Sequence, residues 1–235
     1  MLSYNTDRWK LLAKQKQFWA EIAKDHDHFS WCYQDFSRLR ACLNDTVYIH
    51  PRHFCQKHRV ADMVAWYYID QLDIKDFHNV IDVGCGINPF KPYIKNLTGM
   101  DCDQSLDPDQ VDFFDDEYAS NNTNLWDRII SINSIHFASI EFFVDRINYL
   151  GNMLKPTGKA YVATNLETWL MHTPCEKIQE IFGKLPGIDE ILTYLDICCR
   201  SVTGLAFKDI TVTIVDTNYG IRDDLNGNIR LIIER

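Results

Sequence analysis

The chain has 235 residues, with 24 Lys and Arg against 33 Asp and Glu, so its formal net charge is −9. Hydrophobic residues make up 46% of the sequence and aromatic residues 13%. These values are typical of a globular protein and exclude a wholly disordered or fibrous chain. A chain of this length can bury a large core without disulfides or a structural metal.

Neither a membrane span nor a signal peptide is predicted. The longest clean apolar run, residues 63–69, is far shorter than the roughly 20 residues that cross a bilayer. The first ten residues lack the apolar core of a signal peptide, so we expect a soluble, cytoplasmic protein. The eight cysteines show no Cys-x-x-Cys spacing. This favours reduced thiols over a disulfide framework, and no metal site is predicted.

Charge divides the chain into a basic beginning and an acidic body. Residues 1–60 hold ten Lys and Arg against six Asp and Glu, a net charge of +4, and the remainder carries −13. Apolar spacing predicts helices over about 7–24, 34–43 and 55–72. We therefore assign residues 1–76 to an N-terminal helical extension and residues 77–235 to a second domain.

From residue 79 onward, β-branched runs alternate with helical patterns. The expected strands cover about 80–84, 97–101, 111–114, 127–132, 159–163, 210–215 and 229–233. The expected helices between them cover a short stretch from Pro89, then 141–154, and then about 174–200 with a break near Pro186. Alternation of this kind predicts a mostly parallel sheet. The Asn226-Gly227 turn predicts an antiparallel hairpin at the end.

A Gly-x-Gly turn, Gly84-Cys85-Gly86, follows the first strand, and Asp101 ends the second. Glycine has no Cβ and lets a ligand approach the backbone closely. Both points fall at the carboxyl edge of a parallel sheet, where an acid can accept the hydroxyls of a ribose. Pro89 stands where a dinucleotide fingerprint has its third glycine, which disfavours NAD and FAD. Taken alone, the turn is equally consistent with a tight strand–helix connection.

Five motifs occur in the order found in one known family. They are Val80 to Gly86, Gly99-Met100-Asp101, Trp126 to Ile132, Leu154 to Lys159 and the final hairpin. Over residues 77–235 the chain resembles the class I S-adenosylmethionine-dependent methyltransferases. The resemblance implies a Rossmann-like α/β fold with a mostly parallel seven-stranded sheet. The family's third glycine is replaced here by Asn88, and the first helix is expected to be about one turn shorter than usual.

The resemblance also implies roles for particular residues. Asp82 is expected beside the methionine amino group, and Gly84 and Gly86 are expected to present backbone to the methionine part. Asp101 is expected to bind the ribose hydroxyls, with Cys102 beside the adenine. The remaining expected positions are Asp115 (in competition with Asp112 and Asp116) at the adenine amino group, Asn133 beside the methyl sulfonium, and His136 as the candidate base.

The other acids between residues 101 and 117 are interpreted as a solvated surface, with a hard-cation site as the less favoured alternative. His136 has an alternative role as a structural histidine at a helix start. His50 and His53 are interpreted as loop histidines, and a position over the site is their less favoured alternative. The aromatic residues of the basic block either dock its helices on the sheet domain or help a cap over the site to select the acceptor.

The methyl acceptor is not specified by the sequence. The region Asn133 to Phe137 lacks the motif of amino-directed DNA methyltransferases, and it has no Pro-Cys nucleophile. A small molecule or a protein is therefore favoured, RNA reached through the basic block is an alternative, and DNA is disfavoured. Two further alternatives are a binding or structural module of the same fold without turnover, and a nucleotide-binding oxidoreductase.

Overall fold

The structure is a computed structural model. It describes residues 3–13, 17, 65–86, 88–106, 108–109, 121, 123–132, 134–135, 143–165, 173–184, 186, 190, 193–194, 197, 211–216 and 228–235. Two compact units divide the chain, Met1–Phe113 and Phe114–Arg235. The helix predicted at 34–43 and the strand predicted at 111–114 lie outside the described residues.

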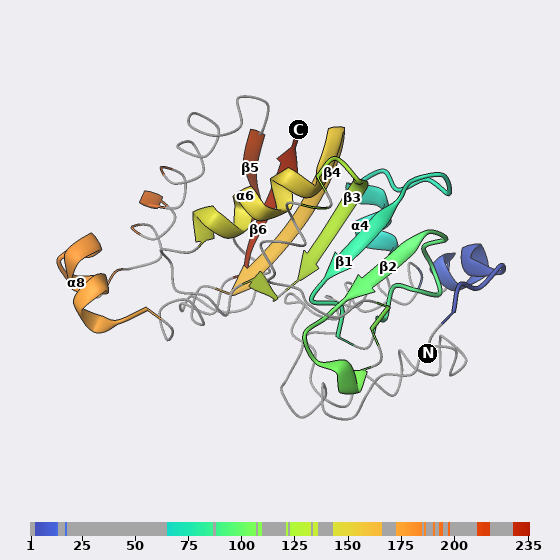
Figure 1. Cartoon of the computed structure of the whole chain (residues 1–235), viewed down its shortest axis with the longest axis horizontal. Coiled ribbons are helices and arrows are strands. Elements are labelled where there is room, and N and C mark those ends of the chain that lie inside the picture. The colour runs from blue at the N-terminus through green and yellow to red at the C-terminus, as the bar shows by residue number, and fades with distance from the viewer. Residues whose placement is uncertain are drawn as a thin grey trace. The chain divides into compact units, whose positions relative to one another are not determined.

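The first unit contains a parallel pair of strands, β1 (Val80–Val83) and β2 (Leu97–Met100). The two strands lie side by side in Figure 1. Val80 pairs with Leu97, and Val83 pairs with Met100. All four residues of β1 are buried, as expected for a short β-branched run in a parallel sheet. Helix α4 (Ala65–Gln71) precedes them, and η2, a 3₁₀ turn at Gln104–Leu106, follows.

The connection from β1 to β2 differs from the expectation. We predicted a short helix beginning at Pro89, but residues 89–93 form turns. Tyr93 and Ile94 both donate backbone bonds to the Phe90 carbonyl, at 2.9 and 3.2 Å. Phe90 also packs on Tyr68 of α4, whose ring centroid lies 5.2 Å away. The turn after β1 therefore does not begin a helix.

A short N-terminal segment is also part of the first unit. Residues 8–13 are helical. Arg8 is 2% exposed, forms an ion pair with Asp76, and donates from Nη1 to the Tyr93 carbonyl at 2.9 Å. Its guanidinium lies 4.2 Å from the ring centroid of Trp9, which is 62% exposed. Arg8 thus takes the interior position, and Trp9 covers it from outside.

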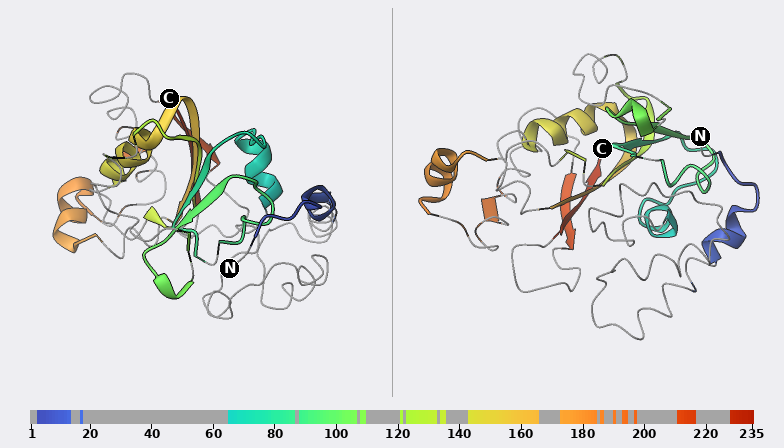
Figure 2. Two further views of the ribbon diagram at one scale, coloured as in Figure 1. Left: turned by 45° about the vertical axis from the view of Figure 1, so that its right-hand side comes forward. Right: turned by 90° about the horizontal axis from the view of Figure 1, so that it is seen from below.

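The second unit contains four strands and two helices. They are β3 (Trp126–Ile132), α6 (Phe143–Met153), β4 (Leu154–Asn165), α8 (Cys175–Phe182), β5 (Thr211–Asp216) and β6 (Asn228–Glu234). The order across this unit is β3-β4-β6-β5. β3 and β4 are parallel, whereas β6 is antiparallel to both β4 and β5. Helix α6 lies beside β4 in Figures 1 and 2.

The predicted turn at 155–158 interrupts β4 rather than preceding it. Trp126 pairs with Leu154, and the next partners are Arg128 and Lys159. Thr157 has a positive φ of 71°. Its N–H donates to the Arg235 carbonyl at 2.7 Å, and the Arg235 N–H donates to the Gly158 carbonyl at 3.1 Å. The interruption is therefore closed by residue 235.

Six of the seven predicted strands are present, each within a few residues of its predicted bounds, and the seventh falls on the undescribed residues 111–114. The predicted α/β class, with parallel pairs and an antiparallel last strand, is confirmed by these pairings. Within the described ranges, no helix is long and apolar enough to cross a bilayer.

Candidate functional site

The turn after β1 folds back onto β2. We call residues 84–88 the glycine loop. Gly84 and Gly86 have positive φ values of 75° and 54°, which L side chains rarely adopt. The Gly84 and Cys85 N–H groups donate to the Met100 carbonyl, at 2.8 and 3.0 Å. The loop is thus held against the end of β2 by two backbone hydrogen bonds.

Asp101, directly after β2, holds the middle of this loop. The Gly86 N–H donates to Asp101 Oδ2 at 2.7 Å, and the Asp103 N–H donates to Oδ1 at 2.9 Å. The Asp101 side chain is 8% exposed. Carboxylate oxygens carry more than one lone pair, so each can accept a further hydroxyl. The predicted pair of Gly86 and Asp101 is therefore brought together.

Asp82 lies within β1, beside this loop. It is 2% exposed, and its Oδ2 has no hydrogen-bond partner among the described residues. Burial raises the pKa of Asp82 well above its ordinary value, and the negative charge of Asp101 raises it further. A buried carboxylate is costly without a donor or a cation beside it. The site thus presents a buried carboxyl group with an unpartnered oxygen, and its ionised form is disfavoured unless a donor or a cation lies beside it.

Neither cysteine near the loop is suited to nucleophilic chemistry. Burial, followed by the charges of Asp82, Asp101 and Asp109, raises the pKa of the Cys85 thiol. Burial and Asp101 also raise the pKa of Cys102. The thiolate is the reactive form of cysteine, so the environment keeps both groups protonated.

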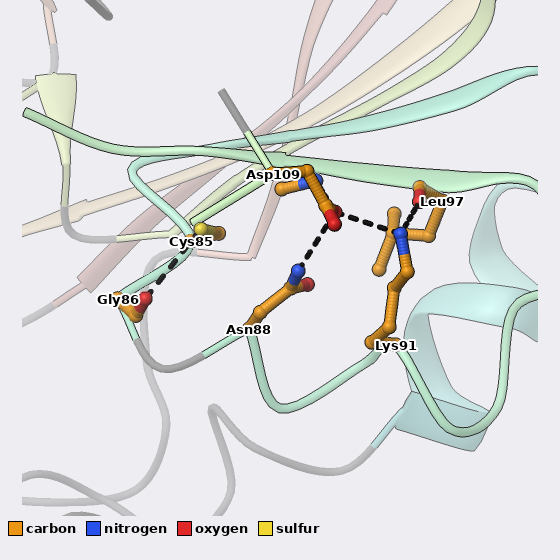
Figure 3. A network of polar contacts seen from close by, with 7 residues as sticks. Cys85, Gly86, Asn88, Lys91, Leu97 and Asp109 are labelled. Carbon is orange, nitrogen blue, oxygen red and sulfur yellow. Dashed lines mark hydrogen bonds and ion pairs between the residues drawn. The ribbon is translucent and has the colours of Figure 1, made fainter. Parts of the chain in front are cut away.

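Asn88 and Asp109 form a contact that the sequence analysis missed. Asn88 is 4% exposed and has a positive φ of 58°. Its Nδ2 donates to Asp109 Oδ2 at 3.0 Å (Figure 3). The same oxygen accepts from the Gly99 N–H and from Lys91 Nζ, both at 2.7 Å. Asp109 had been counted with the solvated acids, because no spacing rule links it to Asn88.

The other predicted site residues are not described. Asp115, Asn133 and His136 lie outside the described residues, as do Asp112 and Asp116. In the second unit, β3 does carry a buried polar group close to its carboxyl end. The hydroxyls of Ser131 and Ser134 lie 2.6 Å apart, and both side chains are buried.

No family model matches the sequence, and no curated protein matches it significantly. Many of the similar solved structures are SAM-dependent methyltransferases. One, from Archaeoglobus fulgidus, has 12% identity and a TM-score of 0.45 over 74% of this chain and 94% of that chain.

A putative S-adenosyl-L-methionine-dependent methyltransferase from Methanococcus maripaludis has 16% identity and a TM-score of 0.46 over 74% of this chain and 84% of that chain. The plantazolicin methyltransferase BpumL, solved in complex with SAH, has 15% identity and a TM-score of 0.42 over 74% of this chain and 82% of that chain. At TM-scores below 0.5, these are similarities only, and they locate neither a site nor a substrate in this chain.

The described residues fit S-adenosylmethionine. Asp82 offers a buried, unsatisfied acceptor for an ammonium group. Asp101 offers a carboxylate that is already oriented by two backbone donors. Between them, the glycine loop presents backbone without Cβ atoms at Gly84 and Gly86. An acceptor, an anionic centre and an open backbone suit a ligand that carries an ammonium, a sulfonium and a ribose.

Proposed function

We propose that the protein is an S-adenosylmethionine-dependent methyltransferase. The observation that carries the proposal is the arrangement around the glycine loop. The Gly86 N–H is fixed on Asp101, and beside it Asp82 is buried with an unpartnered oxygen. A cationic ligand with two vicinal hydroxyls would bring a hydrogen-bond donor to the unpartnered oxygen of Asp82. Its hydroxyls would donate to the remaining lone pairs of the Asp101 carboxylate.

Each residue has a proposed role in binding. Asp82 accepts from the methionine amino group, and the backbone of Gly84 and Gly86 lies along the methionine part. Asp101 accepts from the ribose hydroxyls, and Cys102 flanks the adenine. Asp115 is proposed to accept from the adenine amino group.

When bound, S-adenosylmethionine supplies an activated methyl group, so the protein needs mainly to align the acceptor and exclude water. Asn133 is proposed to line the methyl-transfer position. His136 is proposed as the base that removes a proton from a hydroxyl or ammonium acceptor.

We propose different functions for the two predicted parts of the chain. We propose that residues 77–235 form the methyltransferase domain, and that residues 1–76 form a helical cap that helps to select the acceptor. A small molecule or a protein is the proposed acceptor class, because the acidic body repels the negatively charged phosphodiester backbone of DNA. The proposed site of action is the cytoplasm.

Calorimetry on the full chain tests the cofactor. We expect S-adenosylmethionine and S-adenosylhomocysteine to bind, and NAD not to bind. Absence of binding by the first two would overturn the proposal. Production of S-adenosylhomocysteine in the presence of an acceptor library then separates a methyltransferase from a binding module of the same fold.

A further inference from the structure

β2 and the residue after it hold the glycine loop at three consecutive positions. The Met100 carbonyl accepts from Gly84 and Cys85. Asp101 accepts from Gly86. The Gly99 N–H reaches the far end of the loop indirectly, since it shares Asp109 Oδ2 with the Asn88 amide. The third connection therefore depends on a side chain that belongs neither to the loop nor to β2.

Asn88 depends on this connection for two reasons. Its positive φ is strained for a residue with a Cβ, although Asn tolerates it better than most. Its amide is also buried, and a buried N–H group without an acceptor costs free energy. Asp109 supplies that acceptor and so compensates for the backbone conformation.

The position of Asn88 is coupled to Gly86 through the backbone. The Asn88 N–H donates to the Cys85 carbonyl at 2.8 Å, which closes the loop around Gly86. The Asn88 carbonyl accepts from the Lys91 N–H at 3.1 Å. A shift of Asn88 would therefore open the loop and move the Gly86 N–H relative to Asp101.

Asn88 also packs tightly against β2. A Cβ at Gly99 would lie 2.5 Å from Asn88 Cγ, so residue 99 must lack one. Lys91 adds a positive charge at Asp109, where the ion pair is only one-fifth exposed, and its Nζ also donates to the Leu97 carbonyl. These contacts make Asp109 the centre of a part-buried polar network (Figure 3).

We propose that Asp109 is a positioning residue for the cofactor site, which holds Asn88 on Gly99 and thereby keeps the Gly86 N–H aligned on Asp101. The inference rests on the proposed function, since it assumes that the glycine loop binds S-adenosylmethionine. Asp109 acts through the loop and has no contact with the reacting atoms in this proposal.

The test compares Asp109→Ala with wild type, using S-adenosylhomocysteine as the probe in calorimetry on the full chain. Three donors lose their acceptor, and we expect the Kd to rise about tenfold or more. Asp7→Ala is the matched control, because it breaks an exposed Asp–Lys ion pair, Asp7–Lys10, and should leave the Kd unchanged. The melting temperature of each variant is measured without ligand.

A rescue variant separates positioning from a general loss of stability. Glycine at position 88 adopts a positive φ without strain and has no amide to satisfy. The double variant Asn88→Gly/Asp109→Ala is therefore expected to recover most of the lost affinity. A loss of stability at Gly99 and Lys91 alone would not be repaired by a change at Asn88.

Each outcome decides a different point. If wild type does not bind the probe, the proposed function fails. If wild type binds and Asp109→Ala binds within twofold of it, the function stands and the inference is overturned. If Asp109→Ala raises the Kd and the double variant Asn88→Gly/Asp109→Ala has the same raised Kd, the inference is also overturned. Should Asp109→Ala not fold, Asp109→Asn is judged by the same thresholds, because a neutral amide oxygen is a weaker acceptor than the charged carboxylate oxygen for three donors, one of which is the Lys91 ammonium.

Discussion

The Gly86 N–H and the Asp101 carboxylate are joined by a hydrogen bond of 2.7 Å, so one side chain both shapes the glycine loop and faces the proposed ribose position. An acid that only touched ligand could be removed without consequence for the unliganded protein. Asp101 also organises the loop in the absence of ligand, and its substitution therefore has two separable effects.

Asp101→Ala is expected to weaken S-adenosylhomocysteine binding by about 1.5–3 kcal/mol, the usual value of a hydrogen bond to a charged group. Asp101→Asn keeps an acceptor oxygen for one backbone donor, so its loss should be smaller. Calorimetry measures both, and circular dichroism confirms the fold. An affinity unchanged in Asp101→Ala would refute the ribose assignment.

Gly84→Val is expected to abolish cofactor binding. The φ of 75° at Gly84 is unfavourable for a β-branched residue, and the new side chain would occupy the space proposed for the methionine part. Gly84→Ala should show a milder loss. As a control, Gly183→Ala places a Cβ at the same kind of positive φ, but at the end of α8 with nothing within 4 Å. It should cost stability and leave the Kd unchanged.

Asp82→Asn is expected to stabilise the unliganded protein while weakening cofactor binding. The pKa of Asp82 is raised in the folded state, so between the ordinary value and the raised value the folded protein binds more protons than the unfolded chain. Wild-type stability therefore falls as the pH rises through this window, and it stays lower above it. Each pH unit of the window costs about 1.4 kcal/mol.

Thermal melts at a series of pH values test whether wild-type stability falls as the pH rises. The melting temperatures of wild type and Asp82→Asn should converge at low pH. They should separate as the pH rises, by about 2–4 °C for each 1 kcal/mol in a chain of this size. Wild-type affinity for S-adenosylmethionine should decline on acidification before an ordinary aspartate would protonate. A variant less stable than wild type at neutral pH would contradict the account of Asp82 as a destabilising buried charge.

Arg8→Met is expected to lower the free energy of unfolding by about 1–3 kcal/mol, because the Asp76 ion pair and the bond to the Tyr93 carbonyl are lost from a buried position. Lys10→Met is the matched control. It breaks the exposed pair Asp7–Lys10, whose atoms lie 3.3 Å apart, and exposed pairs contribute little. Denaturant titration measures both variants. Equal stabilities would mean that the N-terminal segment is not anchored through Arg8.

The sequence predicted what depends on local pattern. The buried run of β1, the positive φ at both loop glycines and the approach of Gly86 to Asp101 follow from β-branched residues, missing Cβ atoms and the geometry of parallel strands. The replacement of a glycine of the resembled family by Asn88 was also read from the sequence. The partner of Asn88 was not, because Asp109 lies 21 residues further on and only the folded chain brings them together.

Other differences have the same origin in tertiary contacts. The segment beginning at Pro89 has the composition of a helix start, yet it forms turns in which Phe90 packs against Tyr68 of α4. Within the predicted helix 7–24, Arg8 is buried because Asp76 and the Tyr93 carbonyl satisfy it. Helical periodicity is judged from apolar residues alone, so it cannot predict that a charged residue is buried together with its hydrogen-bond and ion-pair partners.

The position of β6 has a consequence for biosynthesis. It lies between β4 and β5, and Arg235 closes the interruption in β4 through the backbone of Thr157 and Gly158, while its Nη1 donates to the Leu154 carbonyl at 2.7 Å. During translation, β5 emerges before the strand that joins it to β4. The second unit therefore cannot complete its strand pairing until residues 228–235 have left the ribosome, and until then β4 and β5 expose edges open to wrong partners.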